Sequence, residues 1–381
     1  MAGQVVRRGK RSWLVRVSQG RDERGKRRLH SHTVHGTKKD AARYLHGVLH
    51  EQDLGTFKEP TRLSVGQYLD DWLKHGAQPR VRARTHYEYS KLLERYVRPA
   101  LGHKRMATLT PLDVQALYSS MLDRGLSART VRYTHNVLAS ALKQAVKWRL
   151  TATNPAAFTD LPRLARREMQ ALSPEEAQRF LAEAVGNRFE ALFALALATG
   201  MRPSEYLALR WKDLDLEAGT VTIQRVLTRF KGNCSFEEPK TPKSRRTIPL
   251  PESVTRLLTI HRRRQRLERF AAGVRTLTND LVFGTSNDQP LDKHNLVHAY
   301  FKPILKAAKI TRWIRLYDLR HTTATLLLMS GENPKVVAER LGHASVVLTL
   351  DTYSHVLPTM QKAASDRLEA LLFAKGPMAP S

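Results

Sequence analysis

Two stretches of this 381-residue chain carry side chains that could perform chemistry. The first spans residues 200–205 (GMRPSE). The second begins at residues 317–321 (YDLRH) and continues through His343 to Tyr353. Two arginines, a histidine and a tyrosine in this order suit the cleavage of a phosphodiester by a protein nucleophile in place of water.

That reaction sets clear demands on the side chains around the phosphate. Negative charge builds on the non-bridging oxygens, and guanidinium groups suit it because each presents a rigid pair of donors. Loss of one preorganised donor typically costs on the order of 100- to 1000-fold in rate. The leaving 5′-oxygen has a high pKa, so a general acid such as lysine is needed. A tyrosine would form a phosphotyrosyl ester that conserves the bond energy for rejoining, and no metal is required.

The local context of Arg202 suits an anion. Gly200 is predicted to end one helix and Pro203 to begin the next, so backbone N–H dipoles at the helix start add to the arginine charge. Glu205, one turn further on, could orient Arg202. The alternative is a structural Arg–Glu pair at the surface.

The second stretch is also predicted to place its residues at helix ends. Arg320 lies at the start of a predicted helix, and Gly342 is predicted to end the helix that opens at Asn333-Pro334. His343 follows Gly342 directly. Each residue alone has a plain explanation, because buried tyrosines and histidines are commoner than catalytic ones.

Taken together, the two stretches resemble the signature boxes of the tyrosine recombinase (phage integrase) family. The resemblance covers essentially the whole chain, and 22 residues separate Arg320 from His343 and nine separate His343 from Tyr353. It implies that Arg202, Arg320 and His343 are catalytic and that Tyr353 forms a 3′-phosphotyrosyl ester with DNA. Chemistry alone would not select Tyr353 from the eleven tyrosines.

One position departs from the family pattern. Family members commonly carry histidine three residues before the second arginine, where this chain has Tyr317. A phenol can donate to a phosphate oxygen but cannot perform the proton transfer of histidine near neutral pH. His321 is adjacent to Arg320 but is expected to point elsewhere on the helix, so it is not an obvious substitute.

The general-acid lysine has two candidates. Residues 238–250 (EPKTPKSRRTIPL) resemble the hairpin on which the family places this lysine. The number of residues between the lysine and Ile248-Pro249 favours Lys240, and Lys243 is the alternative. Either could instead be a surface lysine that contacts a phosphate.

The composition indicates a polyanionic partner. Lysine and arginine outnumber aspartate and glutamate by 64 to 35, which gives a formal net charge of +29. Self-repulsion of this size works against compactness, and nucleic acid is the commonest partner that offsets it. A membrane-surface or ribosome-bound basic protein is the alternative, which the spread of charge along the whole chain disfavours.

Further features of the composition concern the compartment. Cys234 is the only cysteine, so an internal disulfide cannot form and a structural zinc site is not expected. No apolar run is long enough for a bilayer span, and no secretion signal is visible. We therefore expect a soluble intracellular protein, and the resemblance to phage integrases implies the bacterial cytoplasm and association with the nucleoid.

The patterns along the chain predict a multidomain protein, mainly α-helical with small β-sheets. Residues 1–57 predict strands and then a helix that Thr37 and Asp40 cap. By resemblance this is an arm-type DNA-binding domain, a three-stranded sheet packed on one helix. The alternative is a solvated basic mini-domain.

The middle of the chain, residues 60–162, carries only helical patterns, one of which opens at Thr110-Pro111. The resemblance makes it a core-binding domain, a helical bundle that clamps one face of the DNA duplex. Three aromatic residues are interpreted as bundle core and not as base-stacking groups: Tyr87, Tyr89 and Tyr133.

Residues 169–373 predict a mixed α/β domain that opens with a capping box at Ser173. Strands are predicted at residues 220–230 and 246–250, and the resemblance makes this the catalytic domain. Residues 374–381 are predicted to be a disordered tail.

Basic residues in all three domains are candidate DNA contacts. They are Arg16, Arg27, Arg28, Arg82, Arg84, Lys91, Arg129, Arg132, Arg245 and Arg246. Those of the helical domain are expected to cluster near helix starts.

These inferences predict a site-specific DNA recombinase, without cofactor or metal, that integrates and excises a phage or mobile element. The resemblance implies a homotetramer on core- and arm-type attachment sites, with a possible excisionase and a host DNA-bending protein. The rivals are a catalytically inert DNA-binding regulator and a DNA relaxer similar to type IB topoisomerases.

Overall fold

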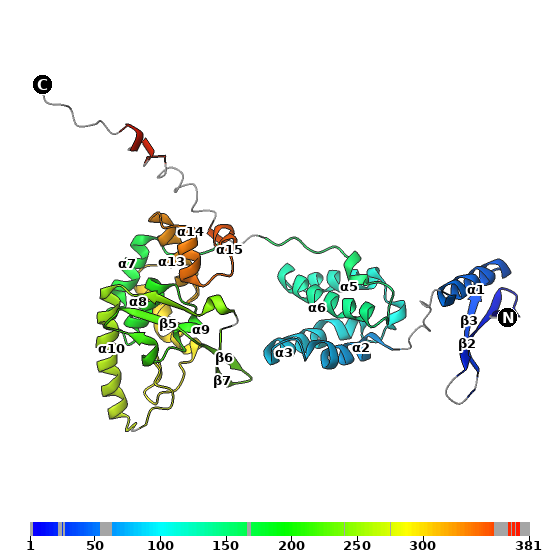
Figure 1. The fold of residues 1–381 in the computed structure, drawn as a ribbon, viewed down its shortest axis with the longest axis horizontal. Helices are drawn as coiled ribbons and strands as arrows, with labels where there is room; N and C mark the ends of the chain where they lie inside the picture. Colours follow the sequence, from blue (N-terminus) through cyan, green and yellow to red (C-terminus); the bar gives the residue numbers. More distant parts are fainter. Residues whose placement is uncertain are drawn as a thin grey trace. The chain divides into compact units, whose positions relative to one another are not determined.

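The computed structural model describes residues 3–21, 25, 27–53, 63–165, 169–239, 241–274, 276–353, 365–366, 368–369 and 371–373. Within these ranges the side chains of residues 19–21, 27, 28, 51 and 242 are not described. The tail predicted at residues 374–381 lies outside the described residues. The chain divides into two compact units, Met1–Ala165 and Arg166–Ser381 (Figure 1).

The first unit begins with a three-stranded antiparallel sheet and one helix. The strands are β1 (Gly3–Gly9), β2 (Ser12–Arg21) and β3 (Arg27–His35), in that order, and α1 (Lys38–Asp53) follows. The backbone N–H of Thr37 donates to the Asp40 carboxylate, and that of Asp40 donates to the Thr37 hydroxyl. A small core joins sheet and helix through Val15, Val17, Ala41 and Val48. The predicted sheet-and-helix fold is confirmed.

The rest of the first unit is helical. Its elements are α2 (Val65–Asp71), η1 (Trp72–Ala77), α3 (Ala83–Leu92), η2 (Leu93–Val97), α4 (Arg98–Leu101), η3 (Met106–Thr108), α5 (Pro111–Asp123), α6 (Ala128–Lys147) and η4 (Pro155–Phe158). Thr110 caps α5 reciprocally with Asp113, and Pro111 takes the first helical position, as predicted. The buried face of α6 includes Val131, Leu138 and Leu142.

The second unit is mixed α/β. It contains α7 (Pro174–Glu183), α8 (Glu190–Thr199), α9 (Pro203–Tyr206), η5 (Trp211–Asp213), β4 (Leu214–Asp215), β5 (Thr220–Ile223), β6 (Val226–Phe230), β7 (Asn233–Glu237), η6 (Pro242–Ser244), β8 (Arg246–Pro249), α10 (Glu252–Ala271), α11 (Lys293–Asn295), η7 (Leu296–Phe301), α12 (Lys302–Ala307), α13 (Asp318–Met329), α14 (Pro334–Leu341) and α15 (Val346–Tyr353). One antiparallel sheet has the order β4-β5-β8, and β6 pairs with β7 in a separate hairpin that projects from the unit (Figure 1).

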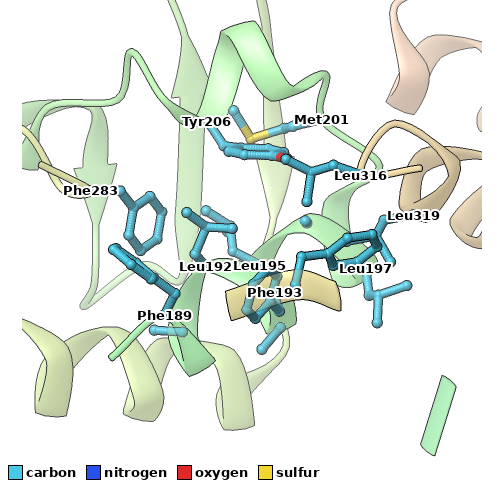
Figure 2. Packing of buried hydrophobic residues seen from close by; sticks show 14 of the residues in the cluster. Phe189, Leu192, Phe193, Leu195, Leu197, Met201, Tyr206, Phe283, Leu316 and Leu319 are labelled. Carbon is cyan, nitrogen blue, oxygen red and sulfur yellow. The ribbon is translucent and has the colours of Figure 1, made fainter. Parts of the chain in front are cut away.

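The core of the second unit surrounds α8. Seven consecutive residues of this helix, from Ala191 to Leu197, are buried, so the helix is apolar on every side and forms the centre of the unit. Figure 2 shows its side chains gathered with Met201, Tyr206, Leu316 and Leu319. The loop that carries Arg202 and the start of α13 are therefore anchored in one hydrophobic core, whereas Tyr353 packs in a separate small cluster.

Some local predictions were wrong. The strand predicted at residues 220–230 is two strands, because β6 leaves the sheet after Gln224-Arg225 and pairs with β7. Lys91 lies in the last turn of α3 and not near a helix start. Tyr133 is 43% exposed and so is not bundle core. Tyr89, by contrast, packs against the bundle core as interpreted, and it stacks on Trp72 with 6.0 Å between ring centroids.

None of the helices in the described part of the chain combines the length and the apolar character needed to cross a membrane.

Candidate active site

The loop between α8 and α9 positions Arg202. Gly200 ends α8 in the left-handed conformation, with φ of +66°. A Cβ at this residue would lie 2.6 Å from Leu341 Cδ2, so both the backbone angle and the space require glycine. Met201 is buried, and Arg202 then caps α9, whose first residue is Pro203. The predicted helix–glycine–arginine–helix arrangement is confirmed.

Glu205 orients Arg202 from the buried side. The Arg202 Nη1 atom donates to Glu205 Oε1 at 2.7 Å, and the Glu205 side chain is 1% exposed while that of Arg202 is 30% exposed. The pair is thus not the surface pair considered as an alternative. The Arg202 side chain remains partly open to solvent, where an anion could reach it.

Arg246 shares the same carboxylate. Its Nη2 lies 3.0 Å from Glu205 Oε2, its Nε donates to the Arg340 carbonyl at 2.6 Å, and its side chain is 8% exposed. Burial alone would raise the pKa of Glu205, but the charges of Arg246 and Arg202 hold it below its ordinary value. Because the guanidinium of Arg246 is occupied inside the protein, the structure favours a positioning role for it over the predicted DNA contact.

Arg320 is the most deeply buried cation of the site, at 1% exposure. Its Nη1 donates to the Gly200 carbonyl at 2.8 Å, and its Nη2 donates to the Leu341 carbonyl at 2.7 Å. Burial and the nearby charge of Arg202 lower its pKa to about 10, so it remains positively charged at neutral pH. Arg320 therefore connects the loop before α9 with the end of α14.

His343 follows the left-handed turn at Gly342, where α14 ends with φ of +67°, as predicted. Its Nδ1 lies 2.7 Å from the Thr349 hydroxyl, and Thr349 is fully buried. Burial, followed by the charges of Arg320 and Arg202, lowers the pKa of His343 to about 4. The imidazole is neutral at neutral pH, and the arginines are close enough to influence it.

Tyr353, at the end of α15, is 1% exposed and packs on Leu328, Val337 and Leu341. Its hydroxyl lies 2.8 Å from Nδ1 of His321. Burial raises the pKa of Tyr353 and the charge of Arg320 opposes that rise. The prediction that His321 points elsewhere was wrong, because α13 directs its ring toward α15.

Tyr317 precedes α13, and its ring centroid lies 5.2 Å from that of His321, one helical turn away. Of the two lysine candidates, Lys240 lies outside the described residues. Lys243 lies in η6, is exposed, and its Nζ donates to the Ala344 carbonyl at 2.8 Å. The structure thus places Lys243 beside the loop that carries His343.

Three distant segments meet in this region: the loop before α9, the start of α13, and the α14–α15 segment. They place Arg202, Arg320, His343 and Tyr353 together. Glu205 pairs with both Arg202 and Arg246, and Arg320 donates to backbone carbonyls, so the charge of the three arginines exceeds that of the one carboxylate. Such a site suits an oxyanion. Within the described ranges, no group of three or more His, Cys, Asp or Glu side chains is arranged to hold a metal ion.

The other candidate DNA contacts vary in exposure. Arg16, Arg82, Arg84, Lys91 and Arg129 are exposed, whereas Arg27 and Arg28 lie on β3 with their side chains outside the description. Arg132 is partly buried and donates to the Pro162 carbonyl at 3.0 Å. Arg245 lies 2.7 Å from the Glu238 carboxylate, with both side chains exposed.

Sequence reasoning missed three residues of the site: His321, Thr349 and Arg246 in its buried role. Thr349 follows His343 by six residues and lies on an otherwise ordinary helix, so no motif singles it out. Arg246 is 41 residues from Glu205. Only the folded chain shows these pairs.

Comparison with known proteins identifies the family. A family model described as "Phage integrase family" matches residues 170–360, and one described as "Phage integrase, N-terminal SAM-like domain" matches residues 64–122. A protein named "Tyrosine recombinase XerC-like" from Caldanaerobacter subterraneus subsp. tengcongensis is 30% identical, over 96% of this chain and 98% of its own. The ICEBs1 integrase of Bacillus subtilis (strain 168) is 28% identical, over 69% of this chain and 72% of its own.

Solved structures share the fold. The Tn1549 transposon integrase, in complex with a circular intermediate DNA, aligns with a TM-score of 0.67 at 24% identity, covering 80% of this chain and 99% of that one. The lambda integrase tetramer bound to a Holliday junction aligns with a TM-score of 0.56 at 18% identity, covering 90% and 95%. These alignments show the shared fold, and the sequence matches show that the chain is a tyrosine recombinase of the phage integrase family.

Proposed function

We propose that Tyr353 is the nucleophile of this recombinase and that Arg202, Arg320 and His343 bind the scissile phosphate. The observation that carries the proposal is the pair of hydrogen bonds from Arg320 to the carbonyls of Gly200 and Leu341. These bonds hold the loop that carries Arg202, and the end of α14 that precedes His343, against the start of α13.

The three phosphate ligands have distinct parts. Arg202 is partly exposed and held by Glu205, so it can offer its remaining N–H groups to a non-bridging oxygen. Arg320 is buried and contributes its positive charge from inside the protein. The neutral His343 can donate an N–H because Thr349 fixes its ring. Preorganised donors of this kind are each worth on the order of 100- to 1000-fold in rate.

Cleavage then exchanges one ester for another. The Tyr353 oxygen attacks phosphorus, the bond from phosphorus to the 5′-oxygen breaks, and a lysine protonates that oxygen. Lys240 and Lys243 remain the candidates for the lysine. Since the Tyr353 side chain is buried in the protein without DNA, the residues that cover it must rearrange to admit the phosphate.

The biological reaction follows from the relatives. The structural neighbours include an integrase with a circular intermediate DNA, a dimer on a core site and a tetramer on a Holliday junction. By extension, we propose that this chain assembles as a tetramer on two attachment sites and integrates or excises a phage or mobile element. An excisionase and a host DNA-bending protein would set the direction.

The domain division supports this reaction. Residues 1–57 would bind arm-type sites, residues 60–162 would bind the core site, and residues 169–373 would perform catalysis. The exposed Arg16, with Arg27 and Arg28 on the same sheet, would belong to the arm contact. Arg82, Arg84, Lys91, Arg129 and Arg132 would belong to the core contact, and Arg245 would add a contact beside the active site.

A nicked half-site DNA tests the nucleophile, because the short strand released by cleavage diffuses away and traps the covalent adduct. The wild-type protein should give an adduct that survives SDS, whereas Tyr353→Phe should give none and should bind the same DNA with unchanged affinity. Adduct formation by Tyr353→Phe would place the nucleophile elsewhere.

The same substrates separate the rivals. A DNA-binding regulator would give no adduct with the wild-type protein. A relaxer similar to type IB topoisomerases would give the adduct and relax supercoiled DNA, but would not join two attachment sites. Recombination of two sites on one plasmid, lost in Tyr353→Phe, is the expected result.

A further inference from the structure

Among the described residues, His321 lies within hydrogen-bond distance of the Tyr353 hydroxyl. Its Nδ1 lies 2.8 Å from that oxygen, and the two side chains are 7% and 1% exposed. A neutral imidazole whose Nδ1 carries no proton can accept this hydrogen bond from the phenol. The contact therefore has the geometry that a transfer of the phenolic proton requires.

Among the described residues, the other groups that act on Tyr353 are less suited to accept its proton. Asp318, whose charge also acts on Tyr353, is paired with Arg315 at 2.7 Å. Tyr317 packs edge-on against His321, with 5.2 Å between ring centroids, but a phenol cannot accept a proton near neutral pH. Arg320 is a cation, and the Nδ1 of His343 is directed at Thr349. His321 combines contact with the hydroxyl and a ring nitrogen that can accept a proton.

We propose that His321 is a catalytic residue of this recombinase, the general base that takes the proton from Tyr353 as its oxygen attacks the phosphate. This inference rests on the proposed role of Tyr353 as the nucleophile. It assigns a proton acceptor to a chain that has tyrosine at position 317.

The step balances in protons and charge. The Tyr353 O–H proton passes to Nδ1 of His321, the phenolic oxygen bonds to phosphorus, and the 5′-oxygen leaves with a proton from the lysine ammonium. The products are the phosphotyrosyl ester, a free 5′-hydroxyl, a neutral lysine and an imidazolium. Rejoining reverses both transfers, so the imidazolium returns its proton to the departing tyrosine.

The electrostatic surroundings allow both forms of His321. The titratable or charged groups around it are Asp318 and Arg320 on its own helix, Arg315 and Tyr317 before that helix, His343, and Tyr353. Burial lowers the pKa of His321 to about 4, while Asp318 acts to raise it. The base is thus neutral before DNA binds. A bound phosphate would offset the Arg320 charge and raise the basicity of His321 when the proton must move.

His321→Asn tests the proton transfer apart from the hydrogen bond, because its amide oxygen can accept from Tyr353 but cannot hold a proton. We expect wild-type affinity for the nicked half-site and single-turnover cleavage slower by on the order of 100-fold or more at neutral pH. Cleavage by the variant should rise with pH in proportion to hydroxide. A wild-type rate and pH profile, or a faster rate, would overturn the proposal.

A more acidic nucleophile provides the rescue. Tyr353 replaced by 3,5-difluorotyrosine ionises more readily, so it should restore most of the rate that His321→Asn loses. No rescue in a variant that still binds DNA would mean that His321 acts by packing alone. The Tyr353→Phe adduct assay remains independent, so a failure of the nucleophile assignment can be distinguished from a failure of the base assignment.

A third measurement needs no change at His321, in case its variants do not fold. In the otherwise wild-type protein, the loss of cleavage at low pH should reflect protonation of the base. It should therefore stay at the same pH when Tyr353 is replaced by 3,5-difluorotyrosine. If the pH at which cleavage is lost shifts with the acidity of the phenol, no protein base is used.

Discussion

The guanidinium of Arg320 donates a hydrogen bond of 2.8 Å to the backbone carbonyl of Gly200, two residues before Arg202 and 120 residues away in sequence. A buried cation on α13 thereby fixes the loop that presents the first arginine. The same group donates to the carbonyl of Leu341, immediately before the Gly342 turn. The site is thus held together by backbone contacts before any DNA is present.

Glu205 is the carboxylate on which this arrangement most depends. It is 1% exposed and accepts from Arg246 and Arg202, so Glu205→Ala would leave a buried guanidinium without its partner. We expect a loss of roughly 3–5 kcal/mol in unfolding free energy, with loss of cleavage. Urea unfolding would measure the loss of unfolding free energy. Hydrogen exchange of peptides from α8 and α13 would show whether the loss is located at the site.

The matched control for that change is Glu238→Ala. Glu238 also pairs with an arginine, Arg245, but the side chains are 79% and 55% exposed. Removing an exposed partner should cost at most about 1 kcal/mol. Equal losses for the two variants would show that burial of Glu205 has no energetic role.

Gly342→Ala should damage the site more than the fold. The φ of +67° at this residue makes any side chain unfavourable by roughly 1–2 kcal/mol. The new Cβ would also lie 2.9 Å from Arg246 Nη1 and 3.1 Å from the Lys243 carbonyl. We expect a displaced Arg246, greatly reduced adduct formation, and a stability loss larger than strain alone gives.

Gly186→Ala isolates the strain. Gly186 has a φ of +75° in the same unit, and a Cβ there meets nothing within 4 Å. It should show a similar strain cost with wild-type adduct formation. Full adduct formation by Gly342→Ala would mean that the position of Arg246 does not matter for cleavage.

Thr349 should control cleavage through His343. Thr349→Val preserves the buried shape but removes the hydroxyl 2.7 Å from the histidine Nδ1, whereas Thr349→Ser retains it. We expect single-turnover cleavage to fall by about 10-fold or more for valine, because the imidazole loses the partner that orients it. Serine should remain near wild type, and both should bind half-site DNA normally. The hypothesis fails if valine cleaves as fast as serine.

The sequence predicted those features that short-range physics decides. The caps at Thr37 and Ser173 need only residues three positions apart, and the turns at Gly200 and Gly342 follow from the special conformational freedom of glycine. Both chemical stretches therefore appeared at the correct helix ends. The sheet-and-helix fold of the N-terminus followed from equally local patterns.

The pairs that complete the site could not be predicted in this way. His321 and Tyr353 are 32 residues apart, and nothing in their spacing shows that α13 and α15 pack with these faces together. The sequence presents Arg246 as a candidate DNA contact, and only the folded chain shows that its side chain is buried and paired with Glu205. Strand β7 was missed because its residues are largely exposed and lack an alternating apolar pattern.

His321 should make the protein less stable in mild acid. Its pKa is about 4 in the folded protein against an ordinary 6.5, so the unfolded chain takes up a proton more readily. The contribution of the neutral His321 to the unfolding free energy is therefore fully present above pH 6.5 and declines as the pH falls toward 4. Unfolding free energies of the wild type and His321→Asn across this range should show a shallower slope for the variant. Parallel slopes would contradict the burial of a neutral imidazole.

The salt dependence of DNA binding should identify which arginines contact phosphates. Arg84 and Arg129 are exposed in the first turns of α3 and α6. Each phosphate contact contributes about one unit to the slope of log affinity against log salt. Alanine at both residues should therefore weaken half-site binding and reduce the slope by about two, whatever the DNA sequence.

Arg98 is the control because its guanidinium already pairs with Asp70 and with Glu94, the latter at 2.9 Å, and its side chain is only 22% exposed. Arg98→Ala removes the same formal charge from the same helical bundle, so a slope set by net charge alone would change equally for each residue replaced. An unchanged slope for Arg98→Ala, with a reduced slope for Arg84→Ala and Arg129→Ala, would assign the latter two to the DNA. If neither replacement lowers the slope, these helix starts do not face the duplex.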